Sequence, residues 1–114
     1  MIEEGDIALF RFPQTNLGSG KYRPALLIKK VPNQFSDWWV CMVSTQIRQQ
    51  VEELEWVLSE DDEDFPKSGL KKKSLIRASR LAVVDERILE GVMGSLGEAN
   101  LRRTKNLIAK WLEA

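Results

Sequence analysis

The sequence predicts a mainly β protein, a small antiparallel barrel closed by a C-terminal helix. Two observations predict this class. Short segments rich in β-branched and aromatic residues, separated by turn residues, recur as far as Val84. The C-terminal end instead carries apolar residues at helical spacing. Because the chain has 114 residues, 43% of them hydrophobic, we expect one domain, 1–114, with a core of its own.

The first two strands are predicted on either side of a glycine-containing loop. Ile7 to Phe12 alternates with period two, so Ile7 and Leu9 share one face. Pro13 ends this strand, and 14–20 is rich in turn residues. Within this loop, we expect Gly18-Ser19-Gly20 to act as a mobile lid over a groove. The second strand is predicted over Ala25 to Val31.

The third strand, Trp38 to Thr45, follows a turn at Pro32 to Asp37 and contains aromatic and β-branched residues. Trp38 and Trp39 are adjacent and must point to opposite faces of a strand, so we expect one in the core and one more exposed. Cys41 is the single cysteine, which excludes an internal disulfide and predicts a buried thiol.

The next segment, Val51 to Leu58, fits a strand better than a helix, because Leu54, Trp56 and Leu58 alternate with Glu53 and Glu55. An acidic, mobile loop is expected over the residues that follow, Ser59 to Gly69.

One or two further strands are predicted over Ser74 to Val84, with Leu75, Leu81 and Val83 on one face. Glu86 to Gly91 is expected to form a short helical turn.

The helix is predicted from Glu98 to Leu112, with Ser95 and Gly97 competing as its N-cap. Its apolar stripe packs on the barrel, and Trp111 is expected in the core or in a dimer interface. The stripe comprises Leu101, Leu107, Ile108, Trp111 and Leu112.

Charge is balanced overall, with 17 basic and 17 acidic residues, but it is unevenly distributed. Between Glu52 and Asp64 there are eight acids and no base, whereas between Phe65 and Leu81 there are six bases and no acid. These two segments either neutralise each other or leave a basic face for an anionic partner. The chain has no histidine, which removes the usual general base and metal ligand, so we predict no metal and no cofactor.

The N-terminus lacks the basic and apolar blocks of a signal peptide, and the longest apolar run, Trp38 to Val43, is far too short to span a membrane. We therefore expect a cytoplasmic protein without a membrane partner.

One cation has a defined position. Pro24 fixes its own backbone angle and favours an extended conformation at Arg23. The guanidinium of Arg23 is therefore held where a loop becomes a strand, which suits a phosphate or carboxylate ligand.

Five short motifs follow one another along nearly the whole chain. They are Gly5-Asp6-Ile7 leading to Phe12-Pro13, Arg23-Pro24-Ala25-Leu26, Val43-Ser44-Thr45-Gln46, Gly69-Leu70-Lys71 leading to Ile76-Arg77, and Gly94-Ser95-Leu96-Gly97 before a helix ending Lys110-Trp111-Leu112. No single motif is specific, but in their order and spacing they resemble the PemK/MazF-type toxins of type II toxin–antitoxin systems.

The resemblance implies an SH3-like barrel of the PemK/MazF/CcdB type that forms a homodimer. It also implies metal-independent cleavage of single-stranded RNA, an mRNA interferase activity held in check by a cognate antitoxin. Arg23 and Thr45 match the family's catalytic arginine and hydroxyl. Binding of RNA is expected at Tyr22, Ser44, Gln46, Arg77, Ser79 and Ser19.

The chain departs from the family where some members carry additional catalytic groups. Ser79 stands where some have an acid, Tyr22 where others have a histidine, and the loop 14–20 contains no acid. These differences leave open a second hypothesis, a non-catalytic barrel that binds an antitoxin peptide, RNA or a gyrase-type protein target.

Overall fold

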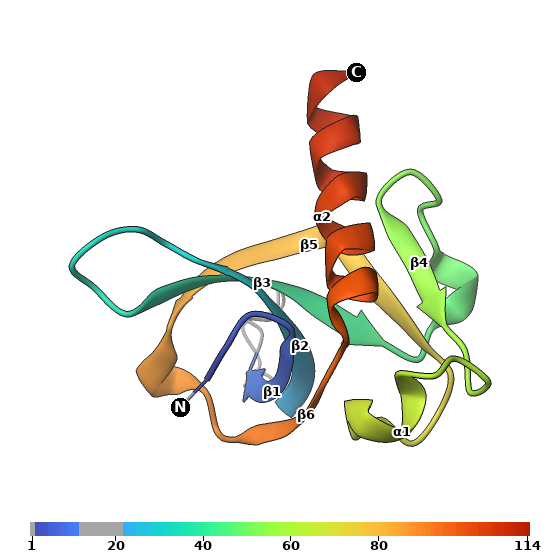
Figure 1. Cartoon of the computed structure of the whole chain (residues 1–114), viewed down its shortest axis with the longest axis horizontal. Coiled ribbons are helices and arrows are strands. Elements are labelled where there is room, and N and C mark those ends of the chain that lie inside the picture. Colours follow the sequence, from blue (N-terminus) through green and yellow to red (C-terminus); the bar gives the residue numbers. More distant parts are fainter. Residues whose placement is uncertain (1, 12–21) are drawn as a thin grey trace, which may run out of the picture.

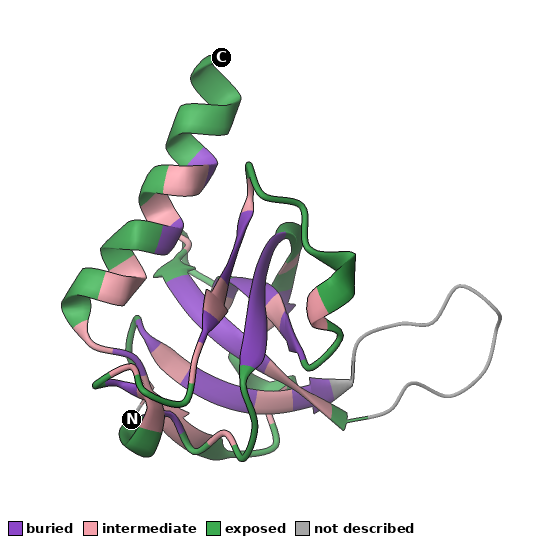
Figure 2. Cartoon of the chain, turned by 90° about the vertical axis from the view of Figure 1, so that its right-hand side faces the viewer, coloured by how far each residue is buried: buried purple, intermediate pink, exposed green. Residues whose placement is uncertain are grey.

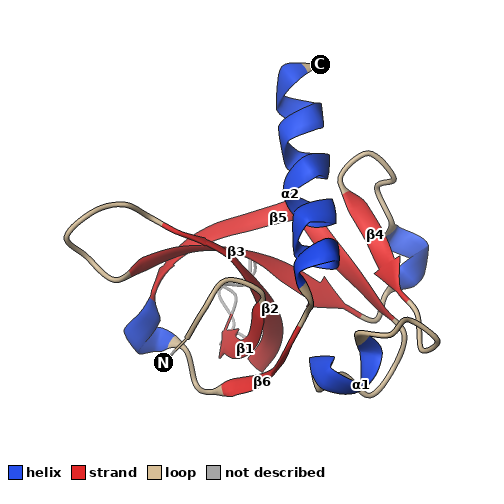
Figure 3. Cartoon of the chain, viewed as in Figure 1, coloured by secondary structure: helices blue, strands red, loops and turns tan. Residues whose placement is uncertain are grey.

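The computed structural model describes residues 2–11 and 22–114, and its six strands form one curled sheet with a long helix against it (Figures 1 and 3). The strands are β1 (Asp6–Arg11), β2 (Tyr22–Lys30), β3 (Asp37–Ser44), β4 (Glu55–Leu58), β5 (Ser74–Asp85) and β6 (Val92–Ser95). The helices are α1 (Phe65–Ser68) and α2 (Glu98–Glu113), with short 3-10 turns η1 (Ile47–Gln49) and η2 (Glu86–Ile88).

The strand order across the sheet is β4-β5-β3-β2-β1-β6, and every neighbouring pair is antiparallel. The sheet curls into a half-barrel, with α1 lying near β6 (Figure 1). The predicted fold class is therefore confirmed. The structure adds one strand, β6, which the sequence analysis did not predict because its four residues include a glycine and show little alternation.

Both faces of the central strands are buried, which explains why these strands are apolar along most of their length. Ile7, Leu26 and Ile28 belong to a core cluster that Ile108 of α2 covers. Phe10 and Leu27 point to the other face and join a second cluster. The two tryptophans at the start of β3 separate as predicted, with Trp38 4% exposed and Trp39 44% exposed.

Pro24 lies inside β2, opposite Leu9 of β1. Both backbone groups of Leu9 bond to the other side, its N–H to the Gly91 carbonyl at 2.9 Å and its carbonyl to the Glu90 N–H at 2.8 Å, so the missing N–H of Pro24 costs no hydrogen bond with Leu9. The second strand thus begins at Tyr22, earlier than predicted, and includes Arg23.

The predicted shared face of Leu75, Leu81 and Val83 is wrong. Leu75 is fully buried, whereas Leu81 and Val83 are 44% and 59% exposed. The cause is a bulge in β5, since Leu81 pairs with Cys41 while Arg77 already pairs with the next residue of β3. The residues 78–80 in between shift the alternation.

The acidic segment is not the free loop that we predicted, because Asp64 is buried against the start of α2. Its Oδ2 accepts from the backbone N–H of Gly97 at 2.8 Å and from Asn100 Nδ2 at 2.8 Å, and its Oδ1 lies 3.2 Å from Lys67 Nζ. Burial alone raises the pKa of Asp64, but these three partners outweigh it and lower the pKa. This carboxylate therefore stabilises the N-terminus of α2, and Gly97 rather than Ser95 is the N-cap.

Helix α2 packs on the sheet as far as Ile108, and its exposed last residues, 109–113, project from the body of the protein (Figure 2). Trp56 of β4 donates to Thr104 Oγ1 at 2.9 Å, and the guanidinium of Arg103 lies over the Trp56 ring at 4.5 Å. Trp111 and Leu112 are 50% and 66% exposed, so neither belongs to the core of this chain. Among the described residues, no helix is long and apolar enough to span a membrane.

Candidate functional site

A pocket of about 330 Å³ lies at one edge of the sheet, where β2 begins and β3 ends. Because these two strands are antiparallel, the start of one and the end of the other meet at the same edge. Its lining comes from β2, β3, the segment before β5, and β6. The lining residues are Tyr22, Arg23, Pro24, Val43, Ser44, Thr45, Leu70, Lys71, Lys72, Ser74 and Met93.

Arg23 is the second residue of β2 and lines this pocket, half-buried. The extended backbone before Pro24 holds it at the sheet edge, opposite Phe10 of β1. Within the described part of the chain, no carboxylate forms an ion pair with Arg23. Its guanidinium is therefore available to an anionic ligand.

Thr45 follows the last residue of β3 and is exposed at the pocket. The turn around it is held by hydrogen bonds: Ser44 Oγ accepts from the backbone N–H of Gln46 at 3.0 Å, and the Thr45 carbonyl accepts from Ile47 at 3.0 Å. The Thr45 hydroxyl makes no hydrogen bond with any residue that the structure describes. Gln46, a predicted binding residue, is exposed just outside the lining.

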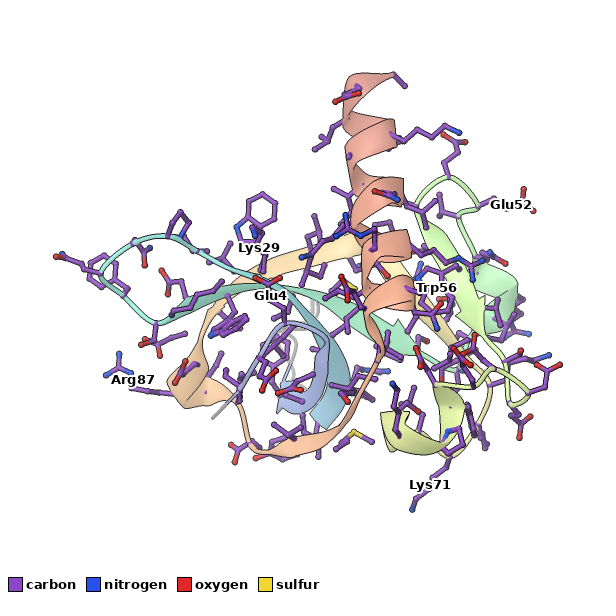
Figure 4. The ribbon with its side chains drawn as sticks, in the orientation of Figure 1. Glu4, Lys29, Glu52, Trp56, Lys71 and Arg87 are labelled. Carbon is purple, nitrogen blue, oxygen red and sulfur yellow. The ribbon has the colours of Figure 1, made fainter. Side chains whose placement is uncertain are left out.

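The part of the pocket lined by Leu70, Lys71 and Lys72 depends on Gly69. Gly69 is the C-cap of α1, and its φ of 77° is left-handed. A Cβ at this position would lie 2.3 Å from the Met93 carbonyl oxygen, so only glycine lets this turn approach β6. This close approach places Leu70, Lys71 and Lys72 beside Met93 in the pocket. Figure 4 shows Lys71 extending away from the body of the protein below α1.

The pocket is cationic although the protein has no net charge. Arg23, Lys71 and Lys72 line it, and no aspartate or glutamate is among its described lining residues. Among the described residues, two ion pairs join the acidic segment 52–64 to the basic segment 65–81. One is the local pair of Asp64 and Lys67, and the other joins Glu55 to Arg77. The two segments therefore do not neutralise each other at the pocket.

Tyr22 places an aromatic ring at the rim and is 50% exposed. Its hydroxyl donates to Glu90 Oε1 at 3.4 Å. A flat, partly exposed ring at the rim of a cationic pocket suits stacking with an unpaired base. Of the other aromatics, Trp56 is buried, and Phe35 is 59% exposed in the turn between β2 and β3.

Arg77 and Ser79 were predicted to bind RNA, but the structure does not bring them to the pocket. Arg77 is only 7% exposed, and its Nε donates to Glu55 Oε2 at 3.0 Å. The Ser79 hydroxyl donates to the same carboxylate. Burial alone raises the pKa of Glu55, but hydrogen bonds from Ser79, the Val51 backbone and Arg77 outweigh it and lower the pKa.

The sequence analysis missed Glu55 because strand alternation assigns it to the face opposite that of the buried Trp56, which would be the solvent-exposed face. Both side chains are buried, since the turn before β4 covers the outer face. A signal was available, as Glu55 alone among the acids of 52–64 sits between apolar strand residues, Leu54 and Trp56. Ser19, the last predicted site residue, lies outside the described residues, as does the whole predicted lid, Gly18-Ser19-Gly20. In the part described, no group of three or more aspartate, glutamate or cysteine side chains is placed to hold a metal ion.

Comparison with known proteins agrees with the resemblance seen in the sequence. The model of the family described as PemK-like, MazF-like toxin of type II toxin-antitoxin system matches residues 3–112. A solved endoribonuclease, in complex with its cognate antitoxin from Mycobacterial species, has a similar fold with a TM-score of 0.70. The alignment covers 99% of this chain and 96% of that chain at 12% identity, which supports the fold alone. No curated protein matches. From the family match over nearly its whole length, this chain belongs to the PemK-like, MazF-like toxins of type II toxin–antitoxin systems.

Proposed function

We propose that this chain is an endoribonuclease that cleaves single-stranded RNA in the cationic pocket. The observation that carries the proposal is the meeting of Arg23 and Thr45, distant in sequence, in one pocket with Lys71 and Lys72. A phosphate is the ligand for which such a set is suited, because arginine and lysine stay charged and the hydroxyl donates a hydrogen bond. Tyr22 at the rim supplies a stacking surface for a neighbouring base.

The reaction that fits this set is internal attack within the RNA. The 2′-oxygen bonds to the adjacent phosphorus and the bond to the 5′-oxygen breaks, which leaves a 2′,3′-cyclic phosphate and a 5′-hydroxyl. Arg23 stabilises the charge that builds on the phosphate oxygens, and the Thr45 hydroxyl donates to one of them. Solvent takes the proton from the 2′-hydroxyl and returns one to the 5′-oxygen, since the described lining offers neither carboxylate nor imidazole.

We further infer a cognate antitoxin as protein partner, because the cationic pocket is available to an acidic peptide as well as to RNA. A homodimer is part of the proposal, supported by the exposed Trp111 and Leu112 on the projecting end of α2. We propose that residues 1–114 act as one domain in the cytoplasm, where its RNA substrate is found.

The test is to incubate purified protein with single-stranded RNA in excess chelator and to analyse the ends of the fragments. We expect discrete cuts with 5′-hydroxyl ends, and their loss in Arg23→Ala. Arg80→Ala is the matched control, because Arg80 is exposed and lies outside the pocket lining. Circular dichroism checks that each variant is folded.

Intact RNA with the folded wild-type protein would overturn the proposal. Binding of RNA or of an antitoxin peptide without cleavage would instead support the non-catalytic binding module. If induced expression in cells stops growth and damages DNA, this result would support a gyrase-type target.

A further inference from the structure

We infer that the buried pair of Glu55 and Arg77 is a positioning device for the turn that carries Thr45, and that Arg77 acts through this turn without touching RNA. The inference rests on the proposed function of the pocket. It assigns a role to a cluster that lies between β4, β5 and the turn after β3, outside the lining of the pocket.

The Glu55 carboxylate is closed to solvent and fully occupied. Its side chain is 0% exposed, and that of Arg77 is 9% exposed. Oε2 accepts from Arg77 Nε at 3.0 Å and from the Ser79 hydroxyl, while Oε1 accepts from the backbone N–H of Val51 at 2.8 Å. A buried carboxylate with three donors is held in one place, so it acts as a fixed anchor.

This anchor holds the far end of the turn after β3. Arg77 Nη1 donates to Gln49 Oε1 at 3.1 Å, and Gln50 Nε2 donates to the Glu55 carbonyl at 3.2 Å. Together with the bond from Val51, three hydrogen bonds therefore tie residues 49–51 to β4 and β5.

The near end of the same turn carries Thr45. The 3-10 turn η1 joins the two ends through hydrogen bonds from Ile47 to the Thr45 carbonyl at 3.0 Å and from Gln49 to the Gln46 carbonyl at 3.0 Å. Since only three residues separate Thr45 from Gln49, a shift of Gln49 changes the position of the Thr45 hydroxyl relative to the other residues of the pocket. Misplacement of a catalytic group by about 1 Å can cost roughly 100-fold in rate.

Arg77 lies directly opposite Glu55 in the pairing of β4 with β5, and this register explains why its guanidinium meets the buried carboxylate. Ser79, two residues further along β5, donates to the same carboxylate. The guanidinium therefore has its counter-charge inside the protein, and a phosphate would have to break that pair to reach it.

The test uses surface variants that leave the buried pair in place. Gln49 and Gln50 are exposed, so Gln49→Ala and Gln50→Ala remove the ties to the turn without opening the core. Gln34→Ala is the matched control, because Gln34 is an exposed glutamine in the turn between β2 and β3. Steady-state cleavage of RNA gives kcat and KM, and amide hydrogen exchange reports on residues 46–51.

We expect Gln49→Ala to lower kcat roughly 10-fold with KM within about twofold, and to speed amide exchange in 46–51 at an unchanged unfolding midpoint. Gln50→Ala should act in the same direction and Gln34→Ala should change neither. Arg77→Met should lower kcat more than Gln49→Ala does. The affinity of this variant for RNA should depend on salt as that of the wild type does.

Unchanged kcat and exchange in Gln49→Ala would overturn the inference, as would a shallower salt dependence with raised KM in Arg77→Met, which would make Arg77 an RNA contact. Amide exchange needs no RNA. A wild-type protein without cleavage activity would therefore refute the proposed function, while the exchange data still decide whether the pair holds the turn.

Discussion

Removal of the Arg23 guanidinium tests how many cations of the pocket contact the RNA backbone. The pocket brings together Arg23, Lys71 and Lys72 without a carboxylate among its described lining residues. Each phosphate that a cation neutralises contributes about −0.7 to the slope of log affinity against log salt for single strands. Three contacts give a slope of about −2.1, which is a loss of roughly 20-fold in affinity between 50 and 200 mM salt.

For Arg23→Ala we expect a slope of about −1.4, so the same salt change weakens binding only about 7-fold. At fixed low salt the variant should bind about 10-fold more weakly. This value corresponds to the lower end of the 1.5–3 kcal/mol typical of charge-assisted hydrogen bonds, because Arg23 is partly exposed.

The assay is fluorescence anisotropy with a labelled single-stranded oligodeoxynucleotide, which lacks the 2′-hydroxyl and is not cleaved by internal attack. The Arg80→Ala variant removes an equal charge outside the pocket and should keep the wild-type slope. Equal slopes for wild type and Arg23→Ala, or a flatter slope for Arg80→Ala, would refute the assignment of the phosphate contacts to this pocket.

Three further outcomes follow from the packing. Gly69→Ala should lower the free energy of unfolding in urea by more than about 2 kcal/mol, because the left-handed φ and the Met93 carbonyl at 2.3 Å oppose a Cβ; a loss below about 0.5 kcal/mol would contradict this. Burial raises the pKa of Cys41 to about 12, so its thiol should not react with a disulfide reagent at pH 8 until urea unfolds the chain. Rapid labelling of the native protein would contradict this prediction. The lowered pKa values of Glu55 and Asp64 mean that their stabilisation is present above the ordinary values of 4.5 and 3.8 and is lost as pH falls below them. The urea midpoint should therefore drop as pH falls from about 5 to about 3, and less steeply in Asp64→Asn. A midpoint that stays constant over this range would contradict the prediction.

Much of the fold followed from local patterns in the sequence. The apolar runs of β1 to β3 are strong because two core clusters bury both faces of these strands. The stripe of α2 is strong because one face of the helix packs on the sheet. Pro24 marked the position of Arg23, the family resemblance pointed to Thr45, and antiparallel pairing brings the two residues into one pocket.

The remaining features depend on contacts between distant segments. The bulge at 78–80 changes which residues of β5 face the core, and no local sequence pattern predicts it. Asp64 became a buried capping group because Gly97 and Asn100 lie beside it in space, not in sequence. The burial of Arg77 likewise follows from Glu55 on a neighbouring strand, a contact that the family resemblance, which pointed to Arg77 as an RNA-binding residue, did not reveal.

The central claim is that RNA is held in the pocket between β2, β3 and the segment before β5. Nuclear magnetic resonance of labelled protein titrated with a single-stranded oligonucleotide locates the contact directly. We expect the shifted amides to cluster at 22–23, 43–45, 70–74 and Met93, with little change at Arg77. Shifts concentrated on α2 or around Trp39, with the pocket amides unmoved, would contradict the account.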